Sequence, residues 1–266
     1  MVIALLTDFG TLDYFVGAMK GAILSINETA QIVDITHEIS PQQINSAGFT
    51  LRACYRNFPK KTIFVAVVDP GVGSNRRAIL VETAGYYFIA PDNGLLGFIY
   101  NEEKNFKVCE LTNEKFFAET VSRTFHGRDI FAPIAAHLSK GVSPAEFGAE
   151  IKDYIRLKTA APVVISEREI EGEIVHVDRF GNLITNLRLF DLPEDGFTLE
   201  IGGKTINKLQ TFFAEGGKGE LFMILGSAGF LEIAAFRDSA ANLLRAKIGQ
   251  KILVTQTDGS AENRIV

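Results

Sequence analysis

Up to about residue 140, short runs of apolar residues alternate with segments of helical periodicity. The apolar runs are nearly continuous rather than alternating, and they are VIALL (Val2 to Leu6), QIVDI (Gln31 to Ile35), TIFVAVV (Thr62 to Val68) and YYFIA (Tyr86 to Ala90). Strands that helices cover on both faces have this texture, because neither face meets water. The pattern predicts an α/β domain.

Helical spacing links these runs. After a candidate N-cap at Asp13, one helix face carries Phe15, Ala18, Met19, Ala22, Ile23 and Ile26. A second helix is predicted to begin with the capping-box pattern of Ser40, Pro41 and Gln43, and its apolar face carries Ile44, Ala47, Leu51, Tyr55 and Phe58. Both predictions use the preference of Ser and Asp for the N-cap and of Pro for the first helical turn.

After about residue 160 the texture changes to short β-prone segments. These are EGEIVHVDRF, NLITNL, FTLEI, KTINKL, GELFMIL, GFLEIAAF and KILVTQ, separated by turns that contain glycine. The pair Gly202-Gly203 has the composition of a two-residue hairpin loop. We therefore expect a small antiparallel β domain, either a barrel or a sandwich.

Composition narrows the class of protein. The chain has 266 residues, 47% of them hydrophobic, which is enough for a well-buried core. A net charge of -5 without a basic stripe argues against a nucleic-acid partner. No apolar run approaches the roughly 18 residues of a membrane span, and no signal-peptide pattern opens the chain, so we expect a cytoplasmic protein with a small-molecule ligand. Cys54 and Cys109 lack metal-ligand spacing and are expected to be small buried hydrophobes.

An acid follows each of four predicted strands. Asp8, Glu38, Asp69 and Asp92 lie at or just after the carboxyl ends of the runs. In open α/β sheets ligands bind at that edge, because loops converge there on a crevice. A single Asp is an ordinary turn residue, so the coincidence of four carries the argument.

Two glycine-bearing segments near these acids suggest different ligands. TDFG with Asp8, followed by Asp13, suggests a carboxylate that faces a vicinal diol such as ribose, although Asp8 could instead cap a turn. Gly71 and Gly73 could form a backbone cradle for phosphate. However, GVGSNR lacks both the third glycine of a dinucleotide fingerprint and the Gly-Lys of a P-loop, which disfavours both of these sites.

Of the four histidines, His126 is the strongest candidate for a functional role, because TFHGRDIFAP places it in a glycine-bearing turn before a predicted helix. A metal-dependent hydrolase using His126 with the strand-end acids stays open as an alternative, though no H-x-x-x-H or H-x-D spacing supports it. His37, His137 and His176 are interpreted as structural. DRFGNLITN and GSAGFLEIA, taken alone, are typical of turns between strands.

Taken together, six segments resemble the S-adenosylmethionine hydroxide adenosyltransferases, also called adenosine-forming S-adenosylmethionine hydrolases, which are relatives of the fluorinating and chlorinating enzymes. The segments are TDFGTLDYFVGAMKG, VVDPGVGSNRRAI, APDNGLL, TFHGRDIFAP, DRFGNLITN and GSAGFLEIA, and they span nearly the whole chain. The resemblance implies a Rossmann-like α/β sheet domain, residues 1–160, followed by a smaller antiparallel β-barrel-like domain, residues 161–266. It also implies a homotrimer with active sites between subunits.

The resemblance further implies roles for individual residues. The family's catalytic trio falls on Asp69, Arg76 and His126, with Arg77 as an alternative to Arg76. The ribose-binding acid matches Asp8, with Asp13 as a second candidate. The remaining substrate-binding candidates lie in the second domain: Asp178 and Asn182 for the methionine and adenine ends, Phe212 or Phe213 against the adenine, Ser227 at the methionine end, and Glu232 in the same segment.

The activity that the resemblance implies is hydrolysis of S-adenosylmethionine to adenosine and methionine, with no cofactor and no metal. Methionine leaves as a neutral thioether, so the difficult step is activation of water, whose pKa is about 15.7. We expect Arg76 and His126 to flank the water and Asp69 to fix their geometry. Two alternatives stay open. A halide-using relative would carry an added loop, which is absent between Asn93 and Thr120, and a binding protein for adenosine or S-adenosylmethionine would not turn over.

Overall fold

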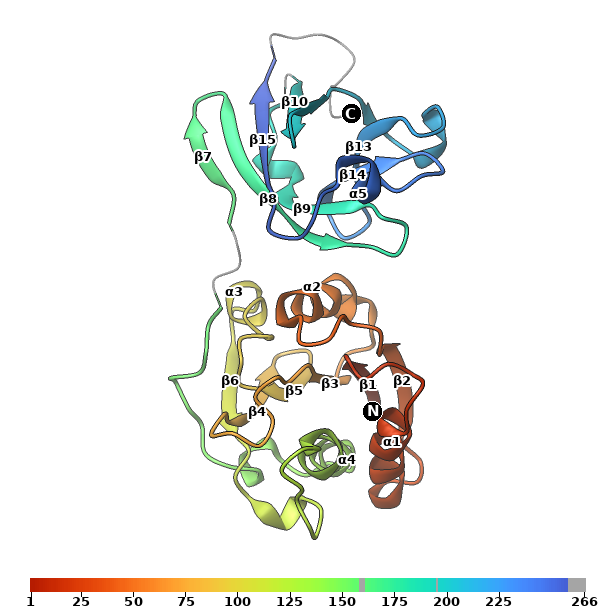
Figure 1. Ribbon diagram of the computed structural model, residues 1–266. Coiled ribbons are helices and arrows are strands. Elements are labelled where there is room, and N and C mark those ends of the chain that lie inside the picture. Colours follow the sequence, from red (N-terminus) through yellow and green to blue (C-terminus); the bar gives the residue numbers. More distant parts are fainter. Residues whose placement is uncertain (158–160, 195, 258–266) are drawn as a thin grey trace. The chain divides into compact units, whose positions relative to one another are not determined.

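The computed structural model describes residues 1–157, 161–194 and 196–257. The chain divides into two compact units, Met1–Thr159 and Ala160–Val266. Residues 158–160 and 258–266, which the predicted domain limits include, lie outside the described residues. Each unit builds its own sheet around its own apolar core (Figure 1).

The first unit alternates strands and helices for most of its length. Its elements are β1 (Val2–Thr7), α1 (Phe15–Ile26), β2 (Gln31–Thr36), α2 (Ile44–Cys54), β3 (Ile63–Val67), β4 (Ala78–Thr83), β5 (Tyr87–Pro91), α3 (Ile99–Glu102), β6 (Phe106–Glu110) and α4 (Ala132–Ser139). A π-helical turn, Gly127–Phe131, leads directly into α4. Both Cys54 and Cys109 are free thiols.

Within residues 1–157, six strands form one sheet in the order β2-β1-β3-β5-β4-β6. The strands β2, β1, β3 and β5 run parallel, and β4 is antiparallel to both of its neighbours. The apolar runs predicted the four parallel strands, whereas β4 and β6 were not predicted. Because β5 lies between β3 and β4, the loop from β3 to β4 crosses the carboxyl end of β5.

Alternate residues of the central strands face two different layers. Ile3 and Leu5 of β1 belong to a core that α1 and α4 cover, while Ala4 and Leu6 belong to a second core that α2 covers. Figure 1 shows α1 and α4 on one face of the sheet and α2 and α3 on the other. This two-sided burial explains why the apolar runs are continuous.

The predicted helix caps are wrong, although the predicted apolar faces are confirmed. Helix α1 begins at Phe15 with Tyr14 at the N-cap position, and α2 begins at Ile44 after Gln43. Neither N-cap side chain makes a capping hydrogen bond. The chain before α2 is instead held in a tertiary contact, since the backbone N–H of Gln42 donates to Asp8 Oδ2. A distant partner therefore replaces the local cap.

The second unit consists mainly of short strands. Its elements are β7 (Val163–Ser166), β8 (Glu169–Val177), β9 (Leu183–Arg188), β10 (Phe197–Ile201), β11 (Lys204–Ile206), β12 (Leu209–Gln210), β13 (Leu221–Leu225), β14 (Phe230–Ala235), α5 (Ala240–Leu244) and β15 (Lys251–Gln256). The predicted hairpin loop is confirmed: Ile201 pairs with Lys204 across Gly202 and Gly203, which both have positive φ, as a type I′ turn requires.

In the described part of this unit, nine strands form a second sheet with the path β11-β10-β15-β8-β9-β14-β13-β12, and β7 pairs with β8. These pairs are antiparallel except β12 with β13, which is parallel. Figure 1 shows this sheet curling on itself. The chain is therefore a mixed α/β protein with two sheets, and among the described residues no helix has the length and apolar character to cross a bilayer.

Candidate active site

The four strand-end acids gather at one edge of the first sheet. Asp8 directly follows β1, Glu38 follows β2, Asp69 follows β3 and Asp92 directly follows β5. Since these four strands are parallel, their carboxyl ends meet at the same edge. The structure gives each acid a different set of partners, and these partners separate a candidate catalytic centre from supporting contacts.

The loop that crosses the end of β5 carries Asp69 and Arg76 and is pinned at both ends. Asn93 Nδ2 donates to the carbonyl of Val68 at 2.8 Å, and the backbone N–H of Asp92 donates to the carbonyl of Arg77 at 2.9 Å. Gly73 has a φ of +77°, and a Cβ there would lie 2.1 Å from the carbonyl oxygen of Arg123. The turn thus requires glycine at this position.

Asp69 and Arg76 form a nearly buried ion pair. Arg76 Nε lies 2.9 Å and 2.8 Å from the two carboxylate oxygens of Asp69, and Arg76 Nη2 donates to Asp69 Oδ2. The side chains are 4% and 10% exposed, respectively. A fork held at two points to a carboxylate has a fixed orientation, and the guanidinium carbon also lies 5.2 Å from the ring centre of Phe131.

His126 completes the trio from the other side of the guanidinium. It caps the π-helical turn, and its Nδ1 lies 3.0 Å from Arg76 Nη2. A guanidinium nitrogen only donates, so Nδ1 must accept, and the ring proton of neutral His126 is then on Nε2. Burial, followed by the Arg76 charge, lowers the pKa of His126, with Asp69 and Asp129 opposing. The geometry favours a neutral ring with its proton on Nε2.

Arg77 belongs to a different cluster, although it neighbours Arg76. Its guanidinium contacts Asp92 Oδ2 through Nε at 3.1 Å and Nη2 at 2.8 Å, and Nη1 lies 2.8 Å from Asp153 Oδ1. Asp92 also accepts from the N–H of Ile155 at 2.8 Å. Arg76, and not Arg77, therefore contacts Asp69 and His126.

Asp8 lies in a turn that the β2 loop supports. Its Oδ2 accepts from the N–H of Gln42 at 2.8 Å, so the β2 loop holds one of the two carboxylate oxygens. Asp13 is exposed and precedes α1. Sequence reasoning missed the residues that hold this turn, above all Thr7 and His37, whose contact spans 30 positions.

In the second unit, Asp178 and Asn182 close one tight turn. Asp178 Oδ1 accepts from the N–H groups of Phe180 and Asn182 at 2.9 Å and 2.8 Å, and Oδ2 accepts from Asn182 Nδ2 at 2.9 Å. Gly181 has a φ of +82°, and a Cβ there would lie 2.1 Å from Ser239 Oγ. The predicted pair is thus brought together, and each member orients the other.

Glu232 lies near this turn on the same sheet. Register places His176 opposite Ile184 and Ile184 opposite Glu232, so these side chains form a row across β8, β9 and β14. Burial, followed by the negative charge of Asp178, raises the pKa of Glu232 to about 7. Burial also lowers the pKa of His176. This face of the sheet therefore carries an acid with a raised pKa and a histidine with a lowered pKa in one row.

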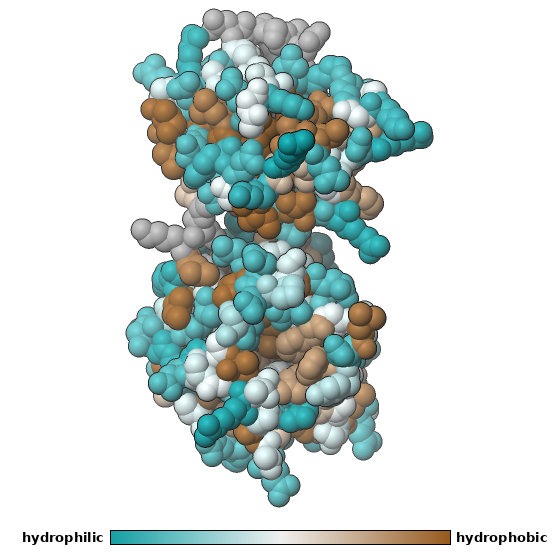
Figure 2. All heavy atoms as spheres, viewed as in Figure 1, coloured by the Kyte–Doolittle hydropathy of each residue, from teal (hydrophilic) through white to brown (hydrophobic). Residues whose placement is uncertain are grey.

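The other candidates in the second unit are exposed. Phe212 and Phe213 are 57% and 46% exposed, and the Phe213 ring lies 6.1 Å from that of Phe222. Ser227 is exposed in the turn between β13 and β14. Figure 2 shows hydrophobic side chains at the surface of both units, in patches between hydrophilic ones.

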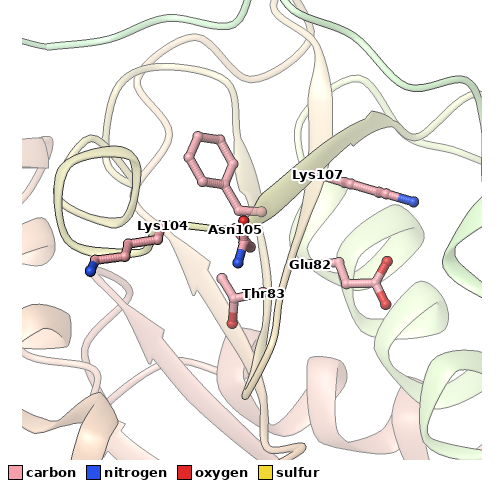
Figure 3. Close-up of a pocket in the computed structure, with 6 residues that line it drawn as sticks. Glu82, Thr83, Lys104, Asn105 and Lys107 are labelled. Carbon is pink, nitrogen blue, oxygen red and sulfur yellow. The ribbon is translucent and has the colours of Figure 1, made fainter.

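A separate hollow of about 450 Å³ lies at the other end of β4 from the trio, between the end of β4 and the start of β6. Glu82, Thr83, Lys104, Asn105, Phe106 and Lys107 line it. Figure 3 shows Glu82 and Lys107 extending to the same side and Lys104 pointing away from them. This hollow contains no member of the trio. Across the described ranges, no three His, Cys, Asp or Glu side chains gather as a metal ion would require.

Comparison with known proteins finds matches over most of the chain. Residues 3–148 match the SAM hydroxide adenosyltransferase N-terminal domain, and residues 172–253 match the C-terminal domain of the same family. The chain is 35% identical over 258 residues to an (R)-S-adenosyl-L-methionine hydrolase of Methanocaldococcus jannaschii, covering 91% of each chain.

Two further similarities extend the comparison. A fluorinase of Actinoplanes sp. is 28% identical over 294 residues, covering 96% of this chain and 97% of the relative. The crystal structure of an uncharacterized conserved protein from Thermotoga maritima superposes with a TM-score of 0.90 at 38% identity, covering 96% of this chain and 100% of that one.

Proposed function

The chain belongs to the SAM hydroxide adenosyltransferase family, and we propose that it hydrolyses S-adenosyl-L-methionine to adenosine and L-methionine by attack of water or hydroxide at the ribose C5′ carbon. Relatives named (R)-S-adenosyl-L-methionine hydrolase, at about 35% identity over most of the chain, support this activity. The observation that carries the mechanism is the contact of one fixed guanidinium with both Asp69 and His126.

The chemistry of the substrate determines what the protein must supply. Water oxygen forms a bond to C5′ while the bond from C5′ to sulfur breaks, and its electron pair stays on sulfur. The sulfonium thus becomes the neutral thioether of methionine, which needs no acid to protonate it. One proton of the water is released to solvent, so the charge of the sulfonium reappears as that proton.

Arg76 is the group that makes water reactive. Its guanidinium stays charged and offers donors in a rigid plane, and Asp69 holds that plane by two nitrogens. A donor aimed at the developing charge on oxygen stabilises hydroxide relative to water without reorganising during the reaction. Asp69 itself accepts from Arg76 through both oxygens, so we assign it orientation rather than proton transfer.

His126 acts as a second donor to the nucleophile. With Nδ1 occupied by Arg76, we assign Nε2–H as the donor to the oxygen that attacks C5′. Two donors on one oxygen fix its direction of approach, and alignment with the breaking bond supplies much of the acceleration. The lowered pKa of His126 keeps the ring neutral at neutral pH, as this role requires.

The rest of the substrate is held by the acids and aromatic rings described above. In this proposal the two ribose hydroxyls donate to Asp8, with Asp13 nearby in the chain, because one carboxylate accepts from a vicinal diol. Asp178, Asn182, Ser227 and Glu232 hold the methionine and adenine ends, and Phe212 or Phe213 packs on the adenine. Each of these contacts is a polar or stacking group of the kind that such a ligand needs.

The remaining parts of the proposal concern architecture and setting. We assign the first unit a Rossmann-like sheet and the second a β-barrel-like sheet, in a cytoplasmic homotrimer whose active sites combine the first unit of one subunit with the second unit of its neighbour. No cofactor or metal takes part. Sedimentation of the full chain tests the trimer, and retention of activity after treatment with a chelator tests the absence of metal.

Hydrolysis at C5′ is tested by incubating the purified protein with S-adenosyl-L-methionine in water enriched in heavy oxygen. The expected product is adenosine that carries the heavy isotope in its 5′ hydroxyl. Adenosine without the label would refute attack at that carbon. A halide-using enzyme, which the similarity to fluorinases makes the natural competitor, would instead form a 5′-halo-adenosine when chloride or fluoride is added, and a binding protein would bind without forming either product.

A further inference from the structure

A network of polar contacts with a buried histidine at its centre connects two loops at the carboxyl edge of the first sheet. His37, which follows β2, is 3% exposed. Its Nδ1 lies 2.9 Å from the hydroxyl of Thr7 at the end of β1, and its Nε2 lies 3.1 Å from Asp34 Oδ1. Asp34 Oδ2 in turn accepts from Lys20 Nζ of α1 at 2.6 Å.

The chemistry of the partners orients the ring of His37. Nε2 of His37 approaches Asp34 Oδ1 at 3.1 Å without the geometry of a hydrogen bond. An ionised carboxylate only accepts, so it favours the tautomer with the proton on Nε2, and Nδ1 then accepts from the Thr7 hydroxyl. That hydroxyl oxygen also accepts from the N–H of Phe9 at 3.2 Å. Burial alone would raise the pKa of Asp34, but Lys20 and His37 outweigh it and lower the pKa. The series of contacts thus runs from Lys20 through Asp34, His37 and Thr7 to the backbone of Phe9.

This chain of contacts ends on both sides of Asp8. Thr7 and Phe9 are its sequence neighbours, and the N–H of Gly10, with a φ of +66°, donates to the carbonyl of His37 at 2.8 Å. The loop that begins at His37 then returns to Asp8, because the N–H of Gln42 donates to Asp8 Oδ2 at 2.8 Å. The residues on both sides of Asp8 and one of its carboxylate oxygens are therefore held by His37 and its loop.

We propose that His37 is a positioning residue that sets the direction of the Asp8 carboxylate toward the ribose diol, and so contributes to nucleoside selectivity without touching the substrate. The inference rests on the proposed function, in which Asp8 accepts from the ribose hydroxyls. Loss of the ring nitrogens frees Thr7 and the Asp8 turn, while the trio at Asp69, Arg76 and His126 makes no contact with this network.

The test compares binding of adenosine with binding of 2′-deoxyadenosine by calorimetry. A hydrogen bond to a charged group is worth about 1.5–3 kcal/mol, so the wild-type protein should prefer adenosine by roughly ten- to hundredfold. His37→Phe keeps a ring of similar size without its nitrogens, and it should reduce that preference to within a few-fold of unity. His137→Phe, the same exchange on α4, is the matched control and should keep the wild-type preference.

Two more variants keep the test decisive if His37→Phe folds poorly. Thr7→Val removes the hydroxyl between His37 and Phe9 and should also reduce the preference, whereas Thr7→Ser keeps the hydroxyl and should retain it. A merely structural role would weaken binding of both nucleosides alike and leave their ratio unchanged. In kinetics, KM for S-adenosyl-L-methionine should rise more than kcat falls.

The outcome for Asp8→Asn separates the two levels of the argument. If this variant loses the preference while His37→Phe and Thr7→Val keep it, His37 has no positioning role, and the assignment of Asp8 stands. If the wild-type protein shows no preference, or Asp8→Asn retains it, the ribose contact itself is wrong and the inference about His37 fails with it.

Discussion

Replacing Arg76 by methionine, with the same change at Arg77 as its neighbour control, gives a direct test of the catalytic assignment. The two residues share a side-chain type and lie next to each other, and each pairs with a nearly buried aspartate. Only Arg76 contacts His126. Both variants therefore lose a comparable ion pair, but only Arg76→Met loses the contact with His126.

The expected magnitudes follow from these contacts. Removing a donor that stabilises charge on the attacking oxygen costs about 10²–10³ in kcat, or roughly 2.7–4 kcal/mol. Arg76→Met also leaves Asp69 unpaired at 4% side-chain exposure, and Arg77→Met leaves Asp92 unpaired at 2%. Breaking a buried pair costs about 3–5 kcal/mol of folding free energy. Stability should therefore fall in both variants, whereas kcat should fall steeply only for Arg76→Met.

The assay measures adenosine formation at saturating S-adenosyl-L-methionine, together with substrate affinity by calorimetry and unfolding by urea. The double variant Asp69→Asn with Arg76→Met removes the uncompensated carboxylate, so it should recover stability without recovering turnover. Arg76→Met should also raise the pKa of His126, because burial and then the Arg76 charge hold it low. Equal loss of kcat in the two single variants, or the larger loss at Arg77, would refute the role assigned to Arg76.

Three further outcomes follow from the geometry. Gly73→Ala should cost roughly 3 kcal/mol or more in urea unfolding and lower kcat, because a positive φ and a contact of 2.1 Å with the Arg123 carbonyl oppose a Cβ; a stability close to wild type would contradict the loop geometry. Glu232 keeps its proton to a pKa of about 7 in the folded chain against an ordinary value of 4.5, so stability falls as pH rises through that window. The pKa shift corresponds to a destabilisation of at most roughly 3 kcal/mol, and partial exposure of Glu232 reduces it. The free energy of unfolding of Glu232→Gln should therefore exceed that of wild type by about 1–2 kcal/mol at pH 8 and equal it at pH 4, measured by urea unfolding. His126 has a pKa below its ordinary 6.5, so acidification from 6.5 downward favours the unfolded chain, and His126→Gln should flatten part of that loss in denaturant titrations at several pH values; an unchanged slope would show that its pKa is not lowered.

The continuous apolar runs predicted β1, β3 and β5 because these strands are buried on both faces. The run of β2 was also predicted, although β2 lies at the edge of the sheet and is partly exposed. The sequence AILVET of β4 is equally apolar, but nothing in its pattern says that it pairs antiparallel between β5 and β6. The hydrophobic pattern indicates that a segment is a buried strand, but it does not determine which strands pair or in which direction. The predicted cap of α2 failed for a related reason, since the backbone N–H of Gln42, just before the helix, donates to the distant Asp8.

In the candidate site too, features within one segment could be predicted from the sequence, whereas contacts between distant residues could not. Glycines and acids within one motif indicated the loop of Asp69 and Arg76, but sequence could not separate Arg76 from Arg77. Successive side chains of an extended segment point to opposite sides, so one arginine meets Asp69 and the other meets Asp92. His37 was interpreted as structural, because its hydrogen-bond partner Thr7 lies 30 positions away on β1.

The passage of the Asp69–Arg76 loop over the end of β5 fixes the stage of folding at which the catalytic centre assembles. The strands β4 and β5 are joined by a short turn that Thr83 and Tyr86 close, so their pairing is local. Local contacts close with less loss of chain entropy than the pairing of β5 with β3. We expect the hairpin to form first and to dock on β3 later, and only docking brings Asp69 to Arg76. During refolding, the return of adenosine production would therefore time the docking of this hairpin and not its formation.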